Sequence, residues 1–179
     1  MFPTETFYGL GADALDASAV ERVTALKGRA PDSPIAVIVA DRAMLAQIVA
    51  DVSPLAEKLI ERFWPGPLTL VLPAKKGLPA PLLNVEGKLG VRVSSHPVAA
   101  RLARDLGRPL TATSANPSGR EAARTIAEAR QYFADKLTIF LDGGVLTAEH
   151  GSTVVEATGD RLKILREGAI RPAELEVIR

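Results

Sequence analysis

The alternation of short apolar runs with amphipathic helical segments is the feature that most constrains the fold of this chain. Residues 35–40 (IAVIVA) are apolar throughout, which is typical of a buried strand. The runs 152–158 and 161–167 are separated only by Gly159 and Asp160. This link is too short for a crossover helix, so these two strands must pair antiparallel. The pattern therefore predicts one α/β domain with a mixed parallel and antiparallel sheet and flanking helices.

Capping residues and proline positions place the expected helices. Asp16 and Ser53 are suitable N-caps, and Pro54 suits a first helical turn. The expected helices run over 17–27, from about Asp41, over 54–63, from Ser95-His96-Pro97 to Gly107, over 121–133 with a second start at Thr125, and briefly from Pro172. The expected strands cover 35–40, 68–74, 88–95, 109–116, 137–142, 152–158 and 161–167. Residues 75–87 and the Ala30-Pro31-Asp32-Ser33-Pro34 stretch are expected to be loops.

Composition excludes several classes of protein. The chain has no cysteine, so disulfides, zinc–thiolate sites and cysteine nucleophiles are absent. No apolar run approaches the roughly 18 residues of a membrane span, and no signal-peptide pattern is present, so we expect no membrane association and a cytoplasmic location. Aromatic residues make up only 4%, which argues against a surface of stacked aromatics for single-stranded RNA. The formal net charge of +1 neither demands nor excludes nucleic acid.

Cations and small polar residues form the candidate site. Lys27-Gly28-Arg29 follows a predicted helix, where a glycine cap and the helix dipole could account for it, or where the two cations could bind an anion. Residues 111–120 (TATSANPSGR) are rich in hydroxyl and amide side chains at the end of a predicted strand, where α/β sheets bind ligands; an ordinary polar turn is the alternative.

Arginines within or beside strands extend this candidate site. Arg92 lies inside the apolar run GVRV, so its guanidinium needs an anionic partner, either a protein carboxylate or a ligand. Ser152 opens one strand, and Arg166 lies near the end of another. His96 is expected to help start a helix. With no nucleophile–base pair in sight, these residues favour a cleft that binds anions and positions substrates electrostatically.

The order of eight motifs resembles one family over essentially the whole chain, from Pro3 to about Ile170. The opening PTETFYGLGA reads as a polar, tightly turned loop. The motifs are PTETFYGLGA, ALKGRAPDSPIAVIV, WPGPLTLVL, GVRVSSHPVA, PLTATSANPSG, DGG, GSTVVE and ILREGAI. Together they resemble the YrdC/Sua5 family of L-threonylcarbamoyladenylate synthases. The resemblance implies a twisted mixed sheet around a basic concave cleft.

The resemblance also implies a reaction and its participants. L-threonine, bicarbonate and ATP would give threonylcarbamoyl-AMP and pyrophosphate, with Mg²⁺ accompanying ATP. The product would feed the t6A modification of tRNA position 37 through downstream transferase proteins. By motif matching, Lys27, Arg29, Ser114 and Asn116 would be catalytic and ATP-binding, and Arg166 would also bind ATP. The threonine contacts would come from Thr4, Arg92, Ala112 and Ser152.

Two departures and two rival interpretations accompany this resemblance. Family members usually carry a helix and part of a strand before PTET, whereas only Met1 and Phe2 precede it here, so residues 1–179 would form one YrdC-like domain without that start. The chain also resembles the single-domain YrdC form, without the further domain of Sua5. One rival is a non-catalytic module that binds nucleotides, double-stranded RNA or tRNA; the other is the carbamoyl-transfer domain of hydrogenase maturation proteins, which carry cysteine zinc fingers.

Overall fold

A computed structural model describes residues 1–30, 33–176 and 178. A six-stranded mixed sheet runs in the order β5-β2-β4-β3-β7-β8. Its strands are β2 (Val37–Ile38), β3 (Leu68–Pro73), β4 (Lys88–Arg92), β5 (Leu110–Thr111), β7 (Thr153–Thr158) and β8 (Arg161–Arg166). The pairs β2–β4 and β3–β7 are parallel, and the other neighbours are antiparallel. The expected mixed sheet, including the antiparallel β7–β8 pair, is confirmed.

A second, two-stranded sheet joins the opening segment to the polar run 111–120. Its strands are β1 (Gly9–Leu10) and β6 (Thr113–Ser114), which pair antiparallel. The segment expected to be a loop thus contains a short strand, and the single strand expected over 109–116 is divided into β5 and β6 at Ala112. This pairing brings the opening loop beside Ser114, a residue more than one hundred positions away in sequence.

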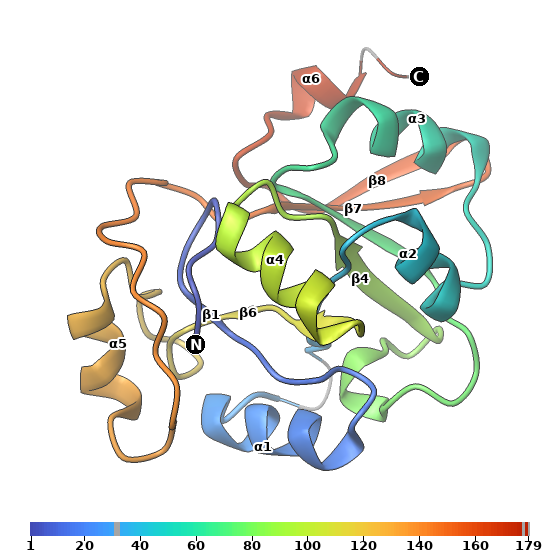
Figure 1. The fold of residues 1–179 in the computed structure, drawn as a ribbon. Coiled ribbons are helices and arrows are strands. Elements are labelled where there is room, and N and C mark those ends of the chain that lie inside the picture. The colour runs from blue at the N-terminus through green and yellow to red at the C-terminus, as the bar shows by residue number, and fades with distance from the viewer. Residues whose placement is uncertain (31–32, 177, 179) are drawn as a thin grey trace.

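The helices begin at the predicted caps. They are α1 (Ala17–Lys27), α2 (Arg42–Ile48), α3 (Pro54–Phe63), α4 (Pro97–Leu106), α5 (Ile126–Phe133) and α6 (Pro172–Glu176). Asp16, Asp41 and Ser53 each accept a hydrogen bond from a main-chain N–H of the first turn, and His96 Nδ1 does the same for α4. In Figure 1, α2, α3 and α4 gather over the six-stranded sheet, and α1 and α5 lie nearer β1 and β6.

Three sequence predictions about local structure are wrong. Residues 121–125 are not helical, because the capping box between Thr125 and Glu128 starts α5 only at Ile126. Residues 137–142 do not form a strand; their main chain bonds to Met1, which donates to the carbonyl of Ile139 and accepts from the amide of Leu141. The loop 75–87 is not wholly exposed, because it contains the 3₁₀ turn η1 (Ala80–Leu82), with Leu82 buried.

Two positions of the predicted loop after Arg29, namely Pro31 and Asp32, lie outside the described residues. Gly28 caps α1 in the left-handed conformation, with φ of 57°, as the glycine-cap interpretation predicted. None of the described helices is both long and apolar enough to cross a membrane.

The two faces of the sheet differ in chemistry. Leu68, Leu70 and Leu72 of β3 are fully buried in the core. Thr69 and Val71 alternate with them and line a cavity on the opposite face. Strand alternation therefore assigns one face to the hydrophobic core and leaves the other for a site.

Candidate functional site

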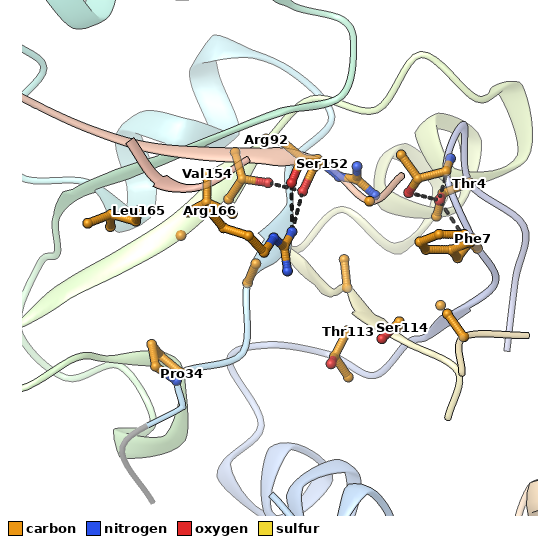
Figure 2. A pocket seen from close by; sticks show the side chains of 18 of the residues that line it. Thr4, Phe7, Pro34, Arg92, Thr113, Ser114, Ser152, Val154, Leu165 and Arg166 are labelled. Carbon is orange, nitrogen blue, oxygen red and sulfur yellow. Dashed lines mark hydrogen bonds between the residues drawn. The ribbon is translucent and has the colours of Figure 1, made fainter. Parts of the chain in front are cut away.

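A cavity of about 720 Å³ lies on the open face of the six-stranded sheet. Its floor is formed by alternate residues of adjacent strands, among them Thr69, Gly90 and Val154. Its walls come from the opening loop, from β6, from the segment that precedes β7 and from the end of β8. Figure 2 shows Arg92, Ser152 and Arg166 on one side of the cavity and Thr113 and Ser114 across from them.

Small side chains keep the floor of the cavity open. Ala36, Gly90 and Ala112 come from or beside three different strands and all line it. A Cβ atom added to Gly90 would lie 3.2 Å from Cγ2 of Thr69 and 3.4 Å from Cβ of Ala36. The lining role predicted for Ala112 agrees with this arrangement, although its contact with threonine stays a prediction.

Four cationic side chains, Arg29, Lys88, Arg92 and Arg166, line the same cavity. Burial lowers the pKa of all three arginines from its usual value, and the pKa of Arg166 is lowered further by the charges of Arg92 and Arg29. Mutual repulsion of this kind is relieved when an anion binds between the cations. The concave, basic character expected from the resemblance is present.

Arg166 is positioned by the serine that opens β7. Its Nη2 donates to the main-chain oxygen of Ser152 at 2.7 Å and to the hydroxyl of Ser152 at 3.1 Å. The Ser152 hydroxyl lies 2.8 Å from the Thr69 hydroxyl. Two residues singled out in the sequence are thus brought together, and Thr69, which was not predicted, completes the chain of polar groups.

Lys27 is buried, with 4% of its surface exposed, and its ammonium group contacts the 114–116 turn. The Nζ atom donates to the main-chain oxygen of Ser114 at 2.7 Å, to its hydroxyl at 3.3 Å and to Oδ1 of Asn116 at 3.0 Å. Burial, and next the charge of Arg29, lowers the pKa of Lys27 to about 8. Lys27, Ser114 and Asn116, three of the residues predicted for the ATP site, therefore meet in one network. Lys27 holds the turn and is not among the residues that line the cavity.

Arg29 reaches the cavity directly. Its Nη1 donates to the Thr113 hydroxyl at 2.8 Å, and its Nε donates to the main-chain oxygen of Ser33 at 2.5 Å. Ser114, whose hydroxyl donates to Oδ1 of Asn116 at 2.6 Å, also lines the cavity. Three of the five residues expected in an ATP site, Arg29, Ser114 and Arg166, thus line the cavity. Lys27 and Asn116 support Ser114 from outside the lining.

The Arg92 guanidinium is paired with a protein carboxylate, which is one of the two kinds of anionic partner that the sequence suggested. Its Nη1 lies 3.0 Å from Oε1 of Glu5 in the opening loop. Burial lowers the pKa of Arg92, and the Glu5 charge acts in the opposite direction. Glu5 was not predicted, although it lies within the quoted PTET motif and is its one acidic residue.

Thr4 lines the cavity, but its hydroxyl is engaged within the opening loop. Its Oγ1 donates to the main-chain oxygen of Phe7 at 2.7 Å and accepts from the amide of Thr6 at 3.2 Å. The Thr6 hydroxyl lies 3.1 Å from it, and Thr6 also lines the cavity. Thr4 therefore shapes the loop, and Thr6 is a second lining hydroxyl from the same loop that the sequence analysis did not select.

Lys88 is another lining residue that was missed. Its Nζ lies 2.5 Å from Oε1 of Glu156 and also pairs with Glu86. The alternation of β4 could have indicated it, since Lys88, Gly90 and Arg92 lie on one face of the strand.

The acidic side chains that line the cavity are Glu149 and Glu167. No group of three or more His, Cys, Asp or Glu residues suited to a metal occurs among the residues that the structure describes. The lining donor set is dominated by cations and hydroxyls, which fit phosphate and carboxylate better than a bare divalent metal.

Several known proteins are similar to this chain over most of its length. The Sua5/YciO/YrdC family model, described as "Telomere recombination", matches residues 1–168. A threonylcarbamoyl-AMP synthase of Pyrococcus abyssi is 37% identical over 177 residues, which cover 99% of this chain and 52% of the relative. A putative threonylcarbamoyl-AMP synthase of Mycobacterium tuberculosis is 37% identical over 170 residues, which cover 95% of this chain and 78% of the relative.

A solved structure shares the fold closely. The crystal structure of P. abyssi Sua5 complexed with L-threonine aligns with a TM-score of 0.94 at 37% identity, covering 99% of this chain and 52% of that one. The chain thus spans about half the length of the P. abyssi relative. The family match over nearly all of the chain and the mixed-sheet fold lead to one conclusion: the chain belongs to the Sua5/YciO/YrdC family.

Proposed function

We propose that this chain is an L-threonylcarbamoyladenylate synthase, which converts L-threonine, bicarbonate and ATP to threonylcarbamoyl-AMP and pyrophosphate. The observation that carries the proposal is the cavity with Arg29, Arg92 and Arg166 in its lining and hydroxyl groups beside them. ATP carries several negative charges and threonine one carboxylate, so each cation gains a partner. The names of the relatives and the threonine complex of P. abyssi Sua5 support the same reaction.

The chemistry needs positioning and charge stabilisation more than a side-chain nucleophile. The threonine ammonium group would first lose a proton, and the resulting amine would form a bond to the carbon of bicarbonate with loss of water. An oxygen of the resulting carbamate would then attack the α-phosphorus of ATP while the bond to pyrophosphate breaks. Fixed cations beside the α-phosphate stabilise the charge that develops in this step.

The proposed roles follow the positions of the side chains. Arg29 and Ser114 would contact the phosphates, with Lys27 and Asn116 holding Ser114 in place. Arg166 would contact ATP, and the apolar side chains of Val154 and Leu165 beside it in Figure 2 offer a surface for the base. Arg92 would bind the threonine carboxylate, and Ala112 and Ser152 would line the amino-acid part of the cavity.

Magnesium would enter with ATP. Mg²⁺ prefers oxygen ligands in octahedral geometry and usually keeps several waters, so the ATP phosphates and water would provide most of its ligands. When bound, the ion would neutralise charge on the departing pyrophosphate. Glu149 and Glu167 are the carboxylates of the cavity lining that could contribute an oxygen.

The wider setting of the reaction is part of the same proposal. The adenylate is a reactive mixed anhydride, so a downstream transferase that modifies tRNA position 37 would consume it, in the cytoplasm. The double-stranded RNA module is not favoured, because the cations converge on a hollow of small-molecule size instead of a flat surface.

Product analysis tests the proposal. Incubation of the chain with threonine, bicarbonate and MgATP is expected to release pyrophosphate, and mass spectrometry is expected to detect threonylcarbamoyl-AMP. Omission of either threonine or bicarbonate should abolish both signals. Pyrophosphate release that does not depend on threonine would contradict the proposed substrate, and its complete absence with a folded chain would contradict the activity.

A further inference from the structure

The ion pair between Glu5 and Arg92 has an uncommon geometry. The atoms Oε1 of Glu5 and Nη1 of Arg92 are 3.0 Å apart, yet both are buried and neither has a hydrogen-bond partner among the described residues. The two groups therefore attract each other by charge without an aligned N–H···O bond. The second oxygen of the carboxylate, Oε2, accepts a hydrogen bond from the hydroxyl of Ser94.

This geometry divides the guanidinium into two edges. Nη1 is the Arg92 nitrogen that is both buried and without a hydrogen bond, and it faces Glu5. No hydrogen bond from Nε or Nη2 to a described residue occurs, and neither atom is buried in this way, so the Nε–Nη2 edge is turned to the cavity that Arg92 lines. That edge is one that binds a carboxylate through two parallel N–H···O bonds.

Glu5 contacts Arg92 from outside the cavity lining. It is not among the lining residues, whereas its neighbours Thr4 and Thr6 are. Its hydrogen bond from Ser94 ties the carboxylate to the segment that directly follows β4. Glu5 is therefore anchored, and a ligand in the cavity can bind the guanidinium without displacing it.

We propose that Glu5 is a positioning residue for the amino-acid substrate. It holds Nη1 of Arg92 by charge, so that the Nε–Nη2 edge is presented to the substrate carboxylate. Glu5 belongs to the opening loop, which forms a wall of the cavity, and Arg92 belongs to β4, which forms part of its floor. The same pair therefore holds the opening loop against β4. This inference rests on the proposed function and adds a residue that never touches the substrate.

The test compares Glu5→Gln with the parent chain by pyrophosphate release. The neutral amide keeps the size of the side chain but loses the charge that orients Arg92. The KM for threonine is expected to rise about 10-fold or more, because a misplaced binding group loses its two-bond geometry. The KM for ATP should change by less than about 2-fold, a separation that general damage to the fold would not produce.

Two further variants complete the test. Glu57→Gln removes an exposed carboxylate that pairs with Arg42 away from the cavity, and it should leave both KM values unchanged. Arg92→Lys replaces the planar edge with a point charge, so adding Glu5→Gln to it should raise the KM for threonine by less than about 3-fold. Independent, multiplicative effects would show that Glu5 does not act through Arg92.

The outcomes separate this inference from the proposed function. An active parent whose KM for threonine is unchanged in Glu5→Gln overturns the positioning role alone. A lower KM for threonine in Glu5→Gln also overturns it, because Glu5 would then compete with the substrate. A parent that neither binds threonine by calorimetry nor releases pyrophosphate overturns both proposals.

Discussion

The ammonium group of Lys27 lies 3.0 Å from Oδ1 of Asn116, and this contact ties the last turn of α1 to the turn that follows β6. The same ammonium donates to the main-chain oxygen of Ser114 at 2.7 Å. Lys27, the last residue of α1, therefore supports the turn that presents Ser114 to the cavity.

Replacement of Lys27 by alanine is expected to reduce both stability and ATP use. Three acceptors, the main-chain oxygen and hydroxyl of Ser114 and Oδ1 of Asn116, would lose a charged donor. This loss costs about 1–3 kcal/mol in the free energy of unfolding. Urea denaturation and the KM for ATP measure the two effects. Lys58→Ala, on the exposed side of α3, is the matched control and should change neither. Full stability and an unchanged KM for ATP in Lys27→Ala would contradict the supporting role.

The Lys27 ammonium is expected to titrate far below an ordinary lysine. Burial lowers its pKa to about 8, from 10.5 in the unfolded chain. Between these two values the unfolded chain binds more protons than the folded one, so this group makes the free energy of unfolding rise with pH. NMR titration of the lysine Cε resonances, assigned with Lys27→Met, measures the pKa directly. Titration of Lys27 near 10.5 would show that its surroundings do not disfavour the charge.

Arg29→Ala should weaken ATP use with little loss of stability, because the guanidinium faces the cavity. Loss of one charge-assisted contact to phosphate corresponds to about 1.5–3 kcal/mol, or roughly 10- to 150-fold in kcat/KM for ATP. Arg101→Ala, which removes an exposed cation from α4, provides the control. An ATP titration of Arg29→Ala that matches the parent would remove Arg29 from the nucleotide site.

Ser114→Ala should impair turnover more than stability. Its hydroxyl donates to Asn116 and faces the cavity, and removal of one such hydrogen bond costs about 1 kcal/mol in stability. We expect a small fall in melting temperature and a clear fall in kcat/KM for ATP. A large fall in melting temperature with normal activity per folded molecule would make Ser114 a purely structural residue.

Amino-acid selectivity should follow the order threonine, serine, valine. A site that hydrogen-bonds the substrate hydroxyl leaves its own polar groups unpaired with valine, and rejection can then reach about 10⁴-fold. Serine lacks only a methyl group, so the preference for threonine over serine should be about 1–3 kcal/mol. The hydroxyls of Thr4 and Ser152, and that of Thr6 beside them, belong to residues that line the cavity and are candidates for this recognition.

Pyrophosphate release at saturating ATP measures the three amino acids side by side. Ser152→Ala is expected to narrow the ratio between threonine and valine, whereas Ser118→Ala, at a residue outside the cavity lining, should preserve it. Valine used as well as serine by the parent chain would contradict a pocket that reads the hydroxyl.

Local signals in the sequence determined most of the helices and the mixed character of the sheet. Asp16, Ser53 and Pro54 act within one turn of their own position, so the caps they predict do not depend on the rest of the molecule. The link at Gly159-Asp160 is likewise too short for a parallel connection, so the two strands that it joins pair antiparallel. The sequence located Lys27, Arg29, Ser114 and Arg166 because cations and small polar residues at the ends of predicted helices and strands can be recognised without the fold.

Only the tertiary structure decided which of these groups line the cavity and which polar atoms are bonded within the protein. Lys27 and Thr4 appear in the motifs as candidate ligands, yet their polar atoms bond within the protein. The apolar run 137–142 has the composition of a strand, but it bonds to Met1 instead of joining the six-stranded sheet. The partner of Arg92 is Glu5, at a separation that no local pattern encodes, because the long-range packing of a loop against a strand selects it.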